Sequence, residues 1–192
     1  MKSKKTPVYL YDLENTILQY RGRKEFFKKK GIEWTEQQYG EIEATKIYAQ
    51  AIVEGLRDGA ITVVVLPTAR ESLKCNQEKG ILNIVYSAGM NKEIEAALNA
   101  SNLLPYIDSW VSTFDLNLTK YKTENNFLLL YKKLLQKGKE IQAYFDDDEI
   151  NLLATKNAAK QILNESGKKI NIYLINPSGT MKSYINKTTE NK

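Results

Sequence analysis

Histidine is absent from this sequence of 192 residues, and cysteine occurs once, as Cys75. Without histidine the chain has no imidazole metal ligand and no histidine base, which excludes Ser-His-Asp and Cys-His hydrolytic centres. A single cysteine excludes an internal disulfide and a cysteine-based zinc site. Any bound metal must therefore rely on oxygen ligands, which Mg²⁺ prefers.

Long hydrophobic runs are also missing. No run approaches the roughly 18 apolar residues that a membrane-spanning helix needs. Residues 1–5 are basic, but the apolar stretch after them is short and contains Asp12, so we expect no signal peptide. These absences favour a cytoplasmic protein without a membrane partner. The length and an apolar fraction of 42% fit one globular domain with room for a small insertion.

Charge is mildly biased, with a formal net charge of +5. This excess fits an anionic partner, but charge alone does not lead us to expect nucleic acid. Six basic residues gather in one short stretch: Arg21, Arg23, Lys24, Lys28, Lys29 and Lys30. They form either a solvated face or a surface that attracts an acidic substrate. The sequence predicts no oligomeric state.

Short apolar runs alternate with helical patterns along most of the chain. The runs predicted as strands, with 63–66 open to being a helix end, are residues 8–11, 63–66, 81–86, 110–114, 141–145 and 170–175. Helical spacing of apolar residues predicts helices at 35–57, 68–80, 91–101, 123–138 and up to about 165. This alternation is typical of a parallel sheet with helices on both faces, so we predict a three-layer, Rossmann-like α/β fold.

The segment 18–58 does not fit this alternation. It is helical in pattern and rich in charge, so we predict a small helical cap inserted after the first strand. The α/β core then comprises residues 1–17 and 59–192. Thr35 with Gln38, and Thr68 with Glu71, have the spacing of capping boxes at helix starts.

Polar residues follow the predicted strands at the points where the strands end. In an open parallel sheet, ligands bind at the carboxyl ends of the strands, so these residues are expected to meet. In chain order they are Asp12 and Glu14, Ser87 with Ala88 and Gly89, Lys120 and Lys122, and Asp146, Asp147 and Asp148. Two carboxylates, a hydroxyl before a helix, a lysine and an acidic cluster would share one edge.

The order of these groups resembles the four motifs of the haloacid dehalogenase (HAD) superfamily. The motifs stand here as VYLYDLENTI, NIVYSAG, TKYKTENNF and YFDDDEINLLA. Each motif is weak alone, but their order and their placement at strand ends make the joint resemblance specific. It spans about residues 7 to 176, and it implies a HAD-like core.

The first motif departs from the commonest HAD pattern, because Glu14 stands where most HAD phosphatases have aspartate. The loop is more similar to the Asp-x-Glu-Gly-Thr loop of enolase-phosphatases, and YSAG is similar to their YSSG. Asn15, however, replaces their glycine, and the spacing before Lys122 fits only with a shift of one residue. The resemblance supports a glutamate-type phosphatase loop without supporting that substrate.

The resemblance implies a Mg²⁺-dependent phosphatase that acts on a small phosphorylated metabolite. Asp12 would attack phosphorus and form an aspartyl-phosphate. The implied ligands of Mg²⁺ are Asp12, the backbone carbonyl of Glu14, and Asp147. Asp147 is preferred because Asn151 and Ala154 follow it as on the family's next helix; Asp146 and Asp148 stay open as alternatives.

The remaining roles also follow from the resemblance. Glu14 would protonate the leaving oxygen and then activate water, which needs a pKa raised towards about 6–7. Ser87 and the amides of Ala88 and Gly89 would hold phosphate oxygens. Lys122 would neutralise Asp12 and the phosphoryl group. It is preferred over Lys120 because Glu124 and Phe127 follow it as in enolase-phosphatases.

Two other functions stay open. One is a protein of the same fold with weak catalysis that binds phosphate or has a regulatory role. Glu14 is one methylene longer than aspartate, and a shift of about 1 Å can reduce a rate about 10²-fold. The other is a phosphatase for nucleotides or nucleic-acid ends that uses the basic cap. Dehalogenase activity is disfavoured, since a departing halide needs no acid such as Glu14.

Overall fold

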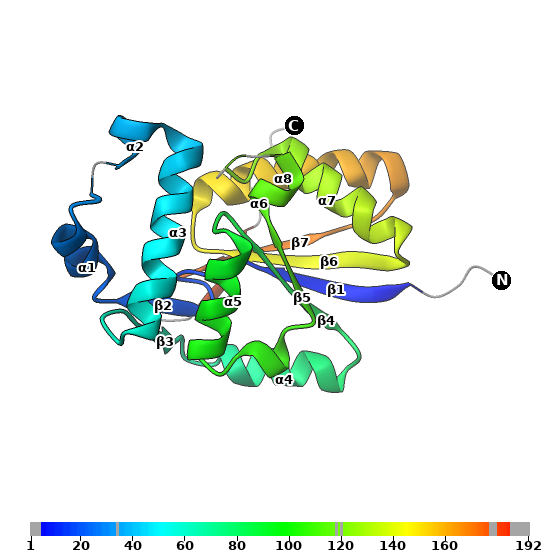
Figure 1. Ribbon diagram of the computed structural model, residues 1–192. Helices are drawn as coiled ribbons and strands as arrows, with labels where there is room; N and C mark the ends of the chain where they lie inside the picture. The colour runs from blue at the N-terminus through cyan, green and yellow to red at the C-terminus, as the bar shows by residue number, and fades with distance from the viewer. Residues whose placement is uncertain (1–4, 34, 118, 120, 177–179, 185–192) are drawn as a thin grey trace.

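The computed structural model describes residues 5–33, 35–117, 119, 121–176 and 180–184. Its centre is a six-stranded sheet of order β5-β4-β1-β6-β7-β8 between two layers of helices (Figure 1). Neighbouring strands are parallel except for the antiparallel pair β7 and β8. The strands are β1 (Thr6–Tyr11), β4 (Leu82–Ser87), β5 (Ser109–Ser112), β6 (Lys139–Asp146), β7 (Asn171–Ile175) and β8 (Met181–Ser183).

Helices cover both faces of this sheet. One face packs against α4 (Ala69–Glu78) and α5 (Asn91–Ala100), and the other against α7 (Glu124–Gln136) and α8 (Glu149–Ser166). The 3₁₀ turn η1 (Leu104–Tyr106) lies between α5 and β5, and the short α6 (Thr113–Asn117) lies between β5 and α7. The prediction of a three-layer α/β fold is confirmed. No helix of the described residues is long and apolar enough to cross a membrane.

Alternation along β1 divides the core into two parts. Val8 and Leu10 point to the side of α7 and α8, where Phe127 and Tyr144 join them. Tyr11 points to the side of α4 and α5. This period of two is the pattern expected for a strand buried on both faces.

The register of β1 and β6 brings two aspartates together. The pairing shifts between Val8 and Tyr9, which is the signature of a bulge, and after it Tyr11 lies beside Phe145. Each of these residues is followed directly by an aspartate, so Asp12 and Asp146 emerge next to each other. The amide of Asp12 donates to the carbonyl of Phe145 at 2.8 Å, which extends the pairing by one step.

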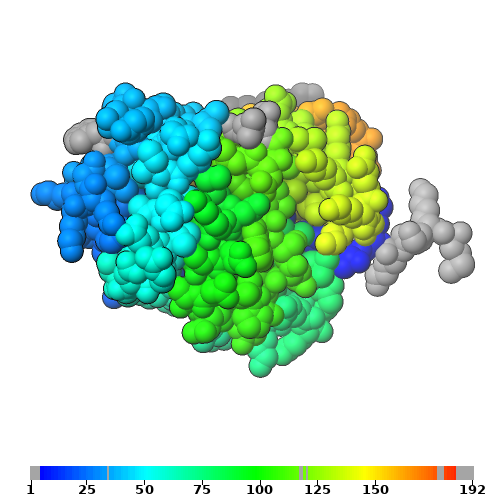
Figure 2. All heavy atoms as spheres, viewed as in Figure 1, coloured from blue at the N-terminus to red at the C-terminus, as the bar shows by residue number. Residues whose placement is uncertain are grey.

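The segment between β1 and α4 folds outside the main sheet. Strands β2 (Leu18–Arg21) and β3 (Thr62–Val65) pair antiparallel and enclose α1 (Arg23–Lys30), α2 (Thr35–Tyr39) and α3 (Glu41–Arg57). Figure 1 places these helices at the carboxyl end of the strands. In Figure 2 the atoms of α3 lie directly against those of α5, with which α3 makes contact. The division into a core and a cap at 18–58 stays a prediction.

Four local predictions need correction, and one alternative that the sequence left open is decided. Residues 35–57 form two helices, because Gly40 (φ 77°, ψ 170°) interrupts them. Of the two alternatives left open for residues 63–66, strand is confirmed for 62–65, which pair with β2. The strand predicted at 110–114 ends at Ser112, where α6 begins. Neither predicted capping box forms: the Thr35 hydroxyl donates to the carbonyl of Ile32, and Thr68 makes no side-chain cap.

Candidate active site

A cavity of about 370 Å³ lies at the carboxyl end of the central strands. Eight residues that the sequence singled out line it: Asp12, Glu14, Ser87, Ala88, Gly89, Lys122, Asp147 and the alternative Asp148. They come from the loop after β1, the turn after β4, the residues before α7 and the loop after β6. The sheet therefore brings the four motifs together. Lys120, the alternative lysine, lies outside the described residues.

Lys122 is placed by the start of α7. The hydroxyl of Thr123 caps this helix by accepting from the amide of Asn126 at 3.2 Å. The side-chain amide of Asn126 donates to the carbonyl of Tyr121 at 2.9 Å. These bonds fix the backbone on both sides of Lys122, whose side chain points inward and is only 2% exposed. A buried lysine requires anionic partners.

The ammonium of Lys122 bridges two buried carboxylates. It donates to Asp12 Oδ1 and, at 2.8 Å, to Asp146 Oδ2. Burial by itself would lower the pKa of Lys122, but the charges of both aspartates outweigh it and raise that pKa above its ordinary value. Burial raises the pKa of Asp12 to about 7, with a further rise from Asp146, while Lys122 acts in the opposite direction.

Asp146 is the most thoroughly bound carboxylate of the site. Besides Lys122, it accepts from the hydroxyl of Tyr144, from the amide of Asp148 at 2.9 Å and from the side chain of Asn151 at 3.3 Å. Asp146 is fully buried. From the sequence it ranked behind Asp147 as a metal ligand, because a pattern of three aspartates does not show which side chain turns inward.

Three carboxylates could hold a cation. Asp12, Asp146 and Asp147 each offer an oxygen, and these oxygens lie within 4.8 Å of one another. Burial and the charge of Asp146 raise the pKa of Asp147. Asp148 has a different role, since its Oδ1 caps α8 by accepting from the amide of Ile150 at 2.8 Å. Oxygen donors of this kind suit Mg²⁺.

The loop after Asp12 is a tight turn built around Asn15. Asn15 has a φ of 59°, and its amide donates to the carbonyl of Leu18 at 2.7 Å. Asparagine is one of the few non-glycine residues that adopts this left-handed backbone readily. Asn15 can therefore occupy this turn without the freedom of a glycine. The side chain of Asn15 also opposes the rise in the pKa of the Asp147 carboxyl.

Glu14 is held by a residue from the inserted segment. Arg23, at the start of α1, donates to Glu14 Oε2 at 2.5 Å, and its guanidinium lies 5.4 Å from the ring centre of Tyr20. Both members of this ion pair are about one-third exposed. Arg23 belongs to the predicted basic stretch, but nothing in the sequence pairs it with Glu14. Lys30 of the same stretch pairs with Glu54 at 2.5 Å.

Ser87, Ala88 and Gly89 form the turn between β4 and α5. The amide of Gly89 donates to Ser87 Oγ at 3.1 Å. Ser87 is buried and lies before the start of α5, where amide groups favour an anion. A Cβ at Gly89 would come within 2.9 Å of Glu93 Oε2, so a larger residue there would require the end of the Glu93 side chain to move.

Glu93 is a site residue that the sequence analysis missed. It lies on the first turn of α5 and lines the same cavity as Asp12. Burial, with a further contribution from the charge of Glu14, raises the pKa of Glu93 to about 7. An acidic residue in the first turn of a helix is common, so its sequence position carried no functional signal.

Comparison with known proteins identifies the fold. No protein-family model and no curated relative matches the sequence. Among solved structures, the Unknown transcript 4 protein of Saccharomyces cerevisiae superposes with a TM-score of 0.64 at 15% identity, over 97% of this chain and 99% of that one. A HAD phosphatase from Thermococcus onnurineus gives 0.62 at 14% identity, over 93% and 89%.

A third match has a different chemistry. L-2-haloacid dehalogenase from Xanthobacter autotrophicus, with chloropropionic acid covalently bound, gives a TM-score of 0.56 at 12% identity, over 89% of this chain and 77% of that one. The chain therefore has the fold of HAD-superfamily hydrolases, as the motifs predicted. At these identities the likeness establishes the fold, and the reaction must be argued from the site.

Proposed function

We propose that this chain is a HAD-type phosphohydrolase that cleaves phosphate monoesters through an aspartyl-phosphate on Asp12. The observation that carries the proposal is that Asp12 and Lys122 line one cavity with Ser87 and Gly89 at the carboxyl end of the sheet. The buried Asp146 holds Lys122 from behind. An anionic nucleophile, a cation and a hydroxyl with backbone amides are the groups that phosphoryl transfer requires.

Mg²⁺ fits the acidic cluster of the site. Asp12, Asp147 and the backbone carbonyl of Glu14 are the proposed ligands, and Asp146 is a further candidate because its oxygen lies in the same cluster. A bound Mg²⁺ would offset the repulsion between an anionic phosphate and the carboxylates. Lys122 adds a second positive charge and holds the Asp12 carboxylate in place.

Asp12 would attack phosphorus while the ester oxygen leaves with a proton. Ser87 Oγ and the amides of Ala88 and Gly89 would hold the non-bridging oxygens. Glu14 is the proposed proton donor and, afterwards, the base that activates water. Arg23 now pairs with Glu14, so the pair must open or turn for Glu14 to serve both steps.

The leaving group has space towards the inserted segment. A second cavity of about 710 Å³ shares Ala88, Gly89 and Glu93 with the first and extends to Arg23 and Phe27. Its volume lies within the usual range for small-molecule sites. This supports a small phosphorylated metabolite as the substrate.

Two observations favour a phosphatase over a dehalogenase. The cluster of three carboxylates could hold a cation. Cleavage of a phosphate ester needs such a cation to neutralise its negative charge. Glu14 stands two residues after Asp12 at the mouth of the same cavity, where it can protonate an alkoxide leaving group. A halide ion leaves without such an acid.

The test is hydrolysis of p-nitrophenyl phosphate by the wild type, Asp12→Asn and Asp58→Asn, each with Mg²⁺ and with chelator. Asp58 is an exposed carboxylate that pairs with Arg57, away from the site, and serves as the matched control. We expect turnover by the wild type and Asp58→Asn with Mg²⁺ only. Equal turnover by Asp12→Asn would overturn the assignment of the nucleophile.

A second candidate function is phosphate binding without turnover. The observation that favours it is the Arg23–Glu14 ion pair, which occupies the proposed proton donor. It predicts Mg²⁺-dependent binding of orthovanadate by the wild type, with no burst of nitrophenol in rapid mixing. If the wild type shows a burst of nitrophenol and Arg23→Gln shows a larger one, Glu14 works as the acid and its ion pair with Arg23 only slows it.

A further inference from the structure

A separate cavity of about 450 Å³ lies on the α4 side of the sheet. It shares no lining residue with the candidate active site. Its floor includes Tyr11 and Phe145, the residues directly before Asp12 and Asp146, and α4 forms one wall. The volume falls in the range of small-molecule sites, which are mostly apolar with a few polar groups.

Aromatic rings make up much of this floor. Tyr11 and Phe145 pair in register on adjacent strands, and their rings stack with centroids 4.6 Å apart and planes 7° apart. Tyr9 adds a tilted ring 5.7 Å from Phe145. The hydroxyl of Tyr11 accepts from the side-chain amide of Asn76 at 2.6 Å, which fixes its ring. A rigid floor of aromatic rings favours a flat aromatic partner, which can stack on a ring or meet it edge to face.

One polar atom in this cavity has no partner. Thr16 lines the cavity and is 5% exposed, yet its hydroxyl makes no hydrogen bond within the part of the chain that the structure describes. Buried polar groups in folded proteins are nearly always hydrogen-bonded, so each exception requires an explanation. This oxygen has almost no accessible surface, so a ligand with a polar group would bond to it after the Thr16 side chain turns towards the cavity.

The mouth of the cavity carries balanced charge and a strained residue. Glu71 and Lys79 line it with opposite charges, so neither sign of ligand is preferred. Thr68, also at the mouth, has a φ of 66°, which is rare for a β-branched residue. Backbone outliers of this kind gather at ligand sites.

We propose that this cavity binds an uncharged planar aromatic molecule with one hydrogen-bonding group. The ring lies against Tyr9, Tyr11 and Phe145, and the polar group bonds to the Thr16 hydroxyl. The inference does not depend on phosphatase activity, because it uses none of the residues assigned to that reaction.

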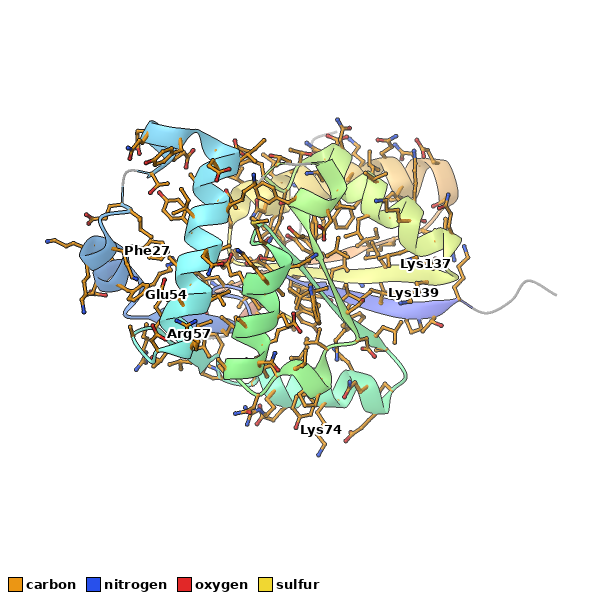
Figure 3. The ribbon with its side chains drawn as sticks, in the orientation of Figure 1. Phe27, Glu54, Arg57, Lys74, Lys137 and Lys139 are labelled. Carbon is orange, nitrogen blue, oxygen red and sulfur yellow. The ribbon has the colours of Figure 1, made fainter. Side chains whose placement is uncertain are left out.

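The test is isothermal titration calorimetry of the full chain with 2-naphthol as the probe. Ser72 faces the cavity from α4, so Ser72→Trp fills it and is expected to weaken binding at least 10-fold. Lys74 is exposed on the outer side of the same helix (Figure 3), so Lys74→Trp is the matched control and should bind like the wild type. Thr16→Val should weaken binding about 3- to 10-fold, the usual effect of one hydrogen bond.

A second measurement does not depend on the folding of these variants. Cys75 lines the cavity and is the only thiol of the chain, so its alkylation by iodoacetamide reports occupancy. Saturating 2-naphthol is expected to slow this reaction in the wild type at least 5-fold. Unchanged alkylation, or equal affinity of Ser72→Trp and Lys74→Trp, would overturn the site. Unchanged affinity of Thr16→Val would overturn the role of its hydroxyl.

Discussion

Lys122 shows how one side chain can hold a whole site together. Its ammonium is buried between Asp12 and Asp146, and each of the three charges compensates the others. Removing one member of a buried ion pair leaves an uncompensated charge, which typically costs about 3–5 kcal/mol. The catalytic geometry and the stability of the fold therefore depend on the same contacts.

We predict that Lys122→Met destabilises the protein by about 3 kcal/mol or more. Methionine fills similar space but leaves Asp12 and Asp146 without their cation. The measurement is urea unfolding followed by circular dichroism at pH 7. Lys132→Met, at an exposed position of α7, is the control and should change the free energy of unfolding by less than about 0.5 kcal/mol. A loss of under about 1 kcal/mol for Lys122→Met would contradict the assigned role.

Glu93 gives a prediction on pH dependence. Its pKa rises from an ordinary value of 4.5 to about 7 in the folded protein, mainly through burial and then through the charge of Glu14. The folded state therefore holds the proton more tightly than the unfolded state does. The stability from Glu93 is fully present below about pH 4.5 and is lost as the pH rises through about 7.

Glutamine cannot titrate, so Glu93→Gln should gain stability relative to the wild type as the pH increases. The difference in unfolding free energy is expected to grow by up to about 3 kcal/mol between pH 4.5 and pH 8. Chemical unfolding of both proteins at several pH values measures it. Glu95→Gln, an exposed position on the same helix, should track the wild type. A pH-independent difference for Glu93→Gln would be the contrary result.

At the scale of elements, two glycines frame the inserted segment. Gly22, between β2 and α1, has a φ of 77°, and a Cβ there would lie 2.6 Å from the carbonyl oxygen of Ala60. Gly59 has a similar φ of 73° but open space around it. The first position therefore needs glycine for its backbone and for the close approach of two chain segments, and the second for its backbone alone.

Gly22→Ala and Gly59→Ala should consequently differ. Alanine at Gly59 is expected to lower the free energy of unfolding by about 1 kcal/mol, the usual effect at a left-handed position. Alanine at Gly22 should lower it by at least about 2 kcal/mol, because the carbonyl of Ala60 must also move. Thermal unfolding of the two variants side by side measures the difference. Equal losses would mean that the close approach has little energetic weight.

Elements were predictable where local signals and packing agree. Thr123 caps α7 at the start of the helix predicted over 123–138, and the apolar runs of β1, β4 and β6 lie in the sheet. Predictions failed where tertiary contacts decide. Thr68 takes up a left-handed conformation instead of capping α4, and Gly40 divides a helix whose apolar spacing continues across it. A local pattern does not record where the chain must turn to meet another segment.

At the scale of the molecule, the parallel sheet explains why so much of the site could be predicted. Strand ends share one edge, so Asp12, Ser87 and the aspartates after β6 had to meet there. Arg23 and Glu93 could not be predicted, because their place depends on how the inserted segment and α5 pack over that edge. That residues 18–58 form a separate helical cap stays a prediction.

Three carboxylates gather at the edge of the sheet with Lys122 in contact with two of them, so this edge should respond to Mg²⁺. Asp12, Asp146 and Asp147 raise one another's affinity for positive charge, and Lys122 is the cation in contact with two of them. A ligand that binds only the folded state stabilises it by about 2.7 kcal/mol at 100 times its dissociation constant. Millimolar Mg²⁺ should therefore raise the thermal midpoint of the whole chain.

We expect the rise in thermal midpoint caused by Mg²⁺ to depend on which of the three consecutive aspartates is substituted. Asp147→Asn should lose most of the Mg²⁺-dependent rise, because one oxygen of the cluster no longer carries charge. Asp148→Asn should keep the rise, even if its own midpoint is lower, because Asp148 caps α8. Thermal scans with Mg²⁺ and with chelator measure both increments. Equal increments in the two variants would remove Asp147 from the ligand set and leave Asp12 with Asp146 as the pair that binds the cation.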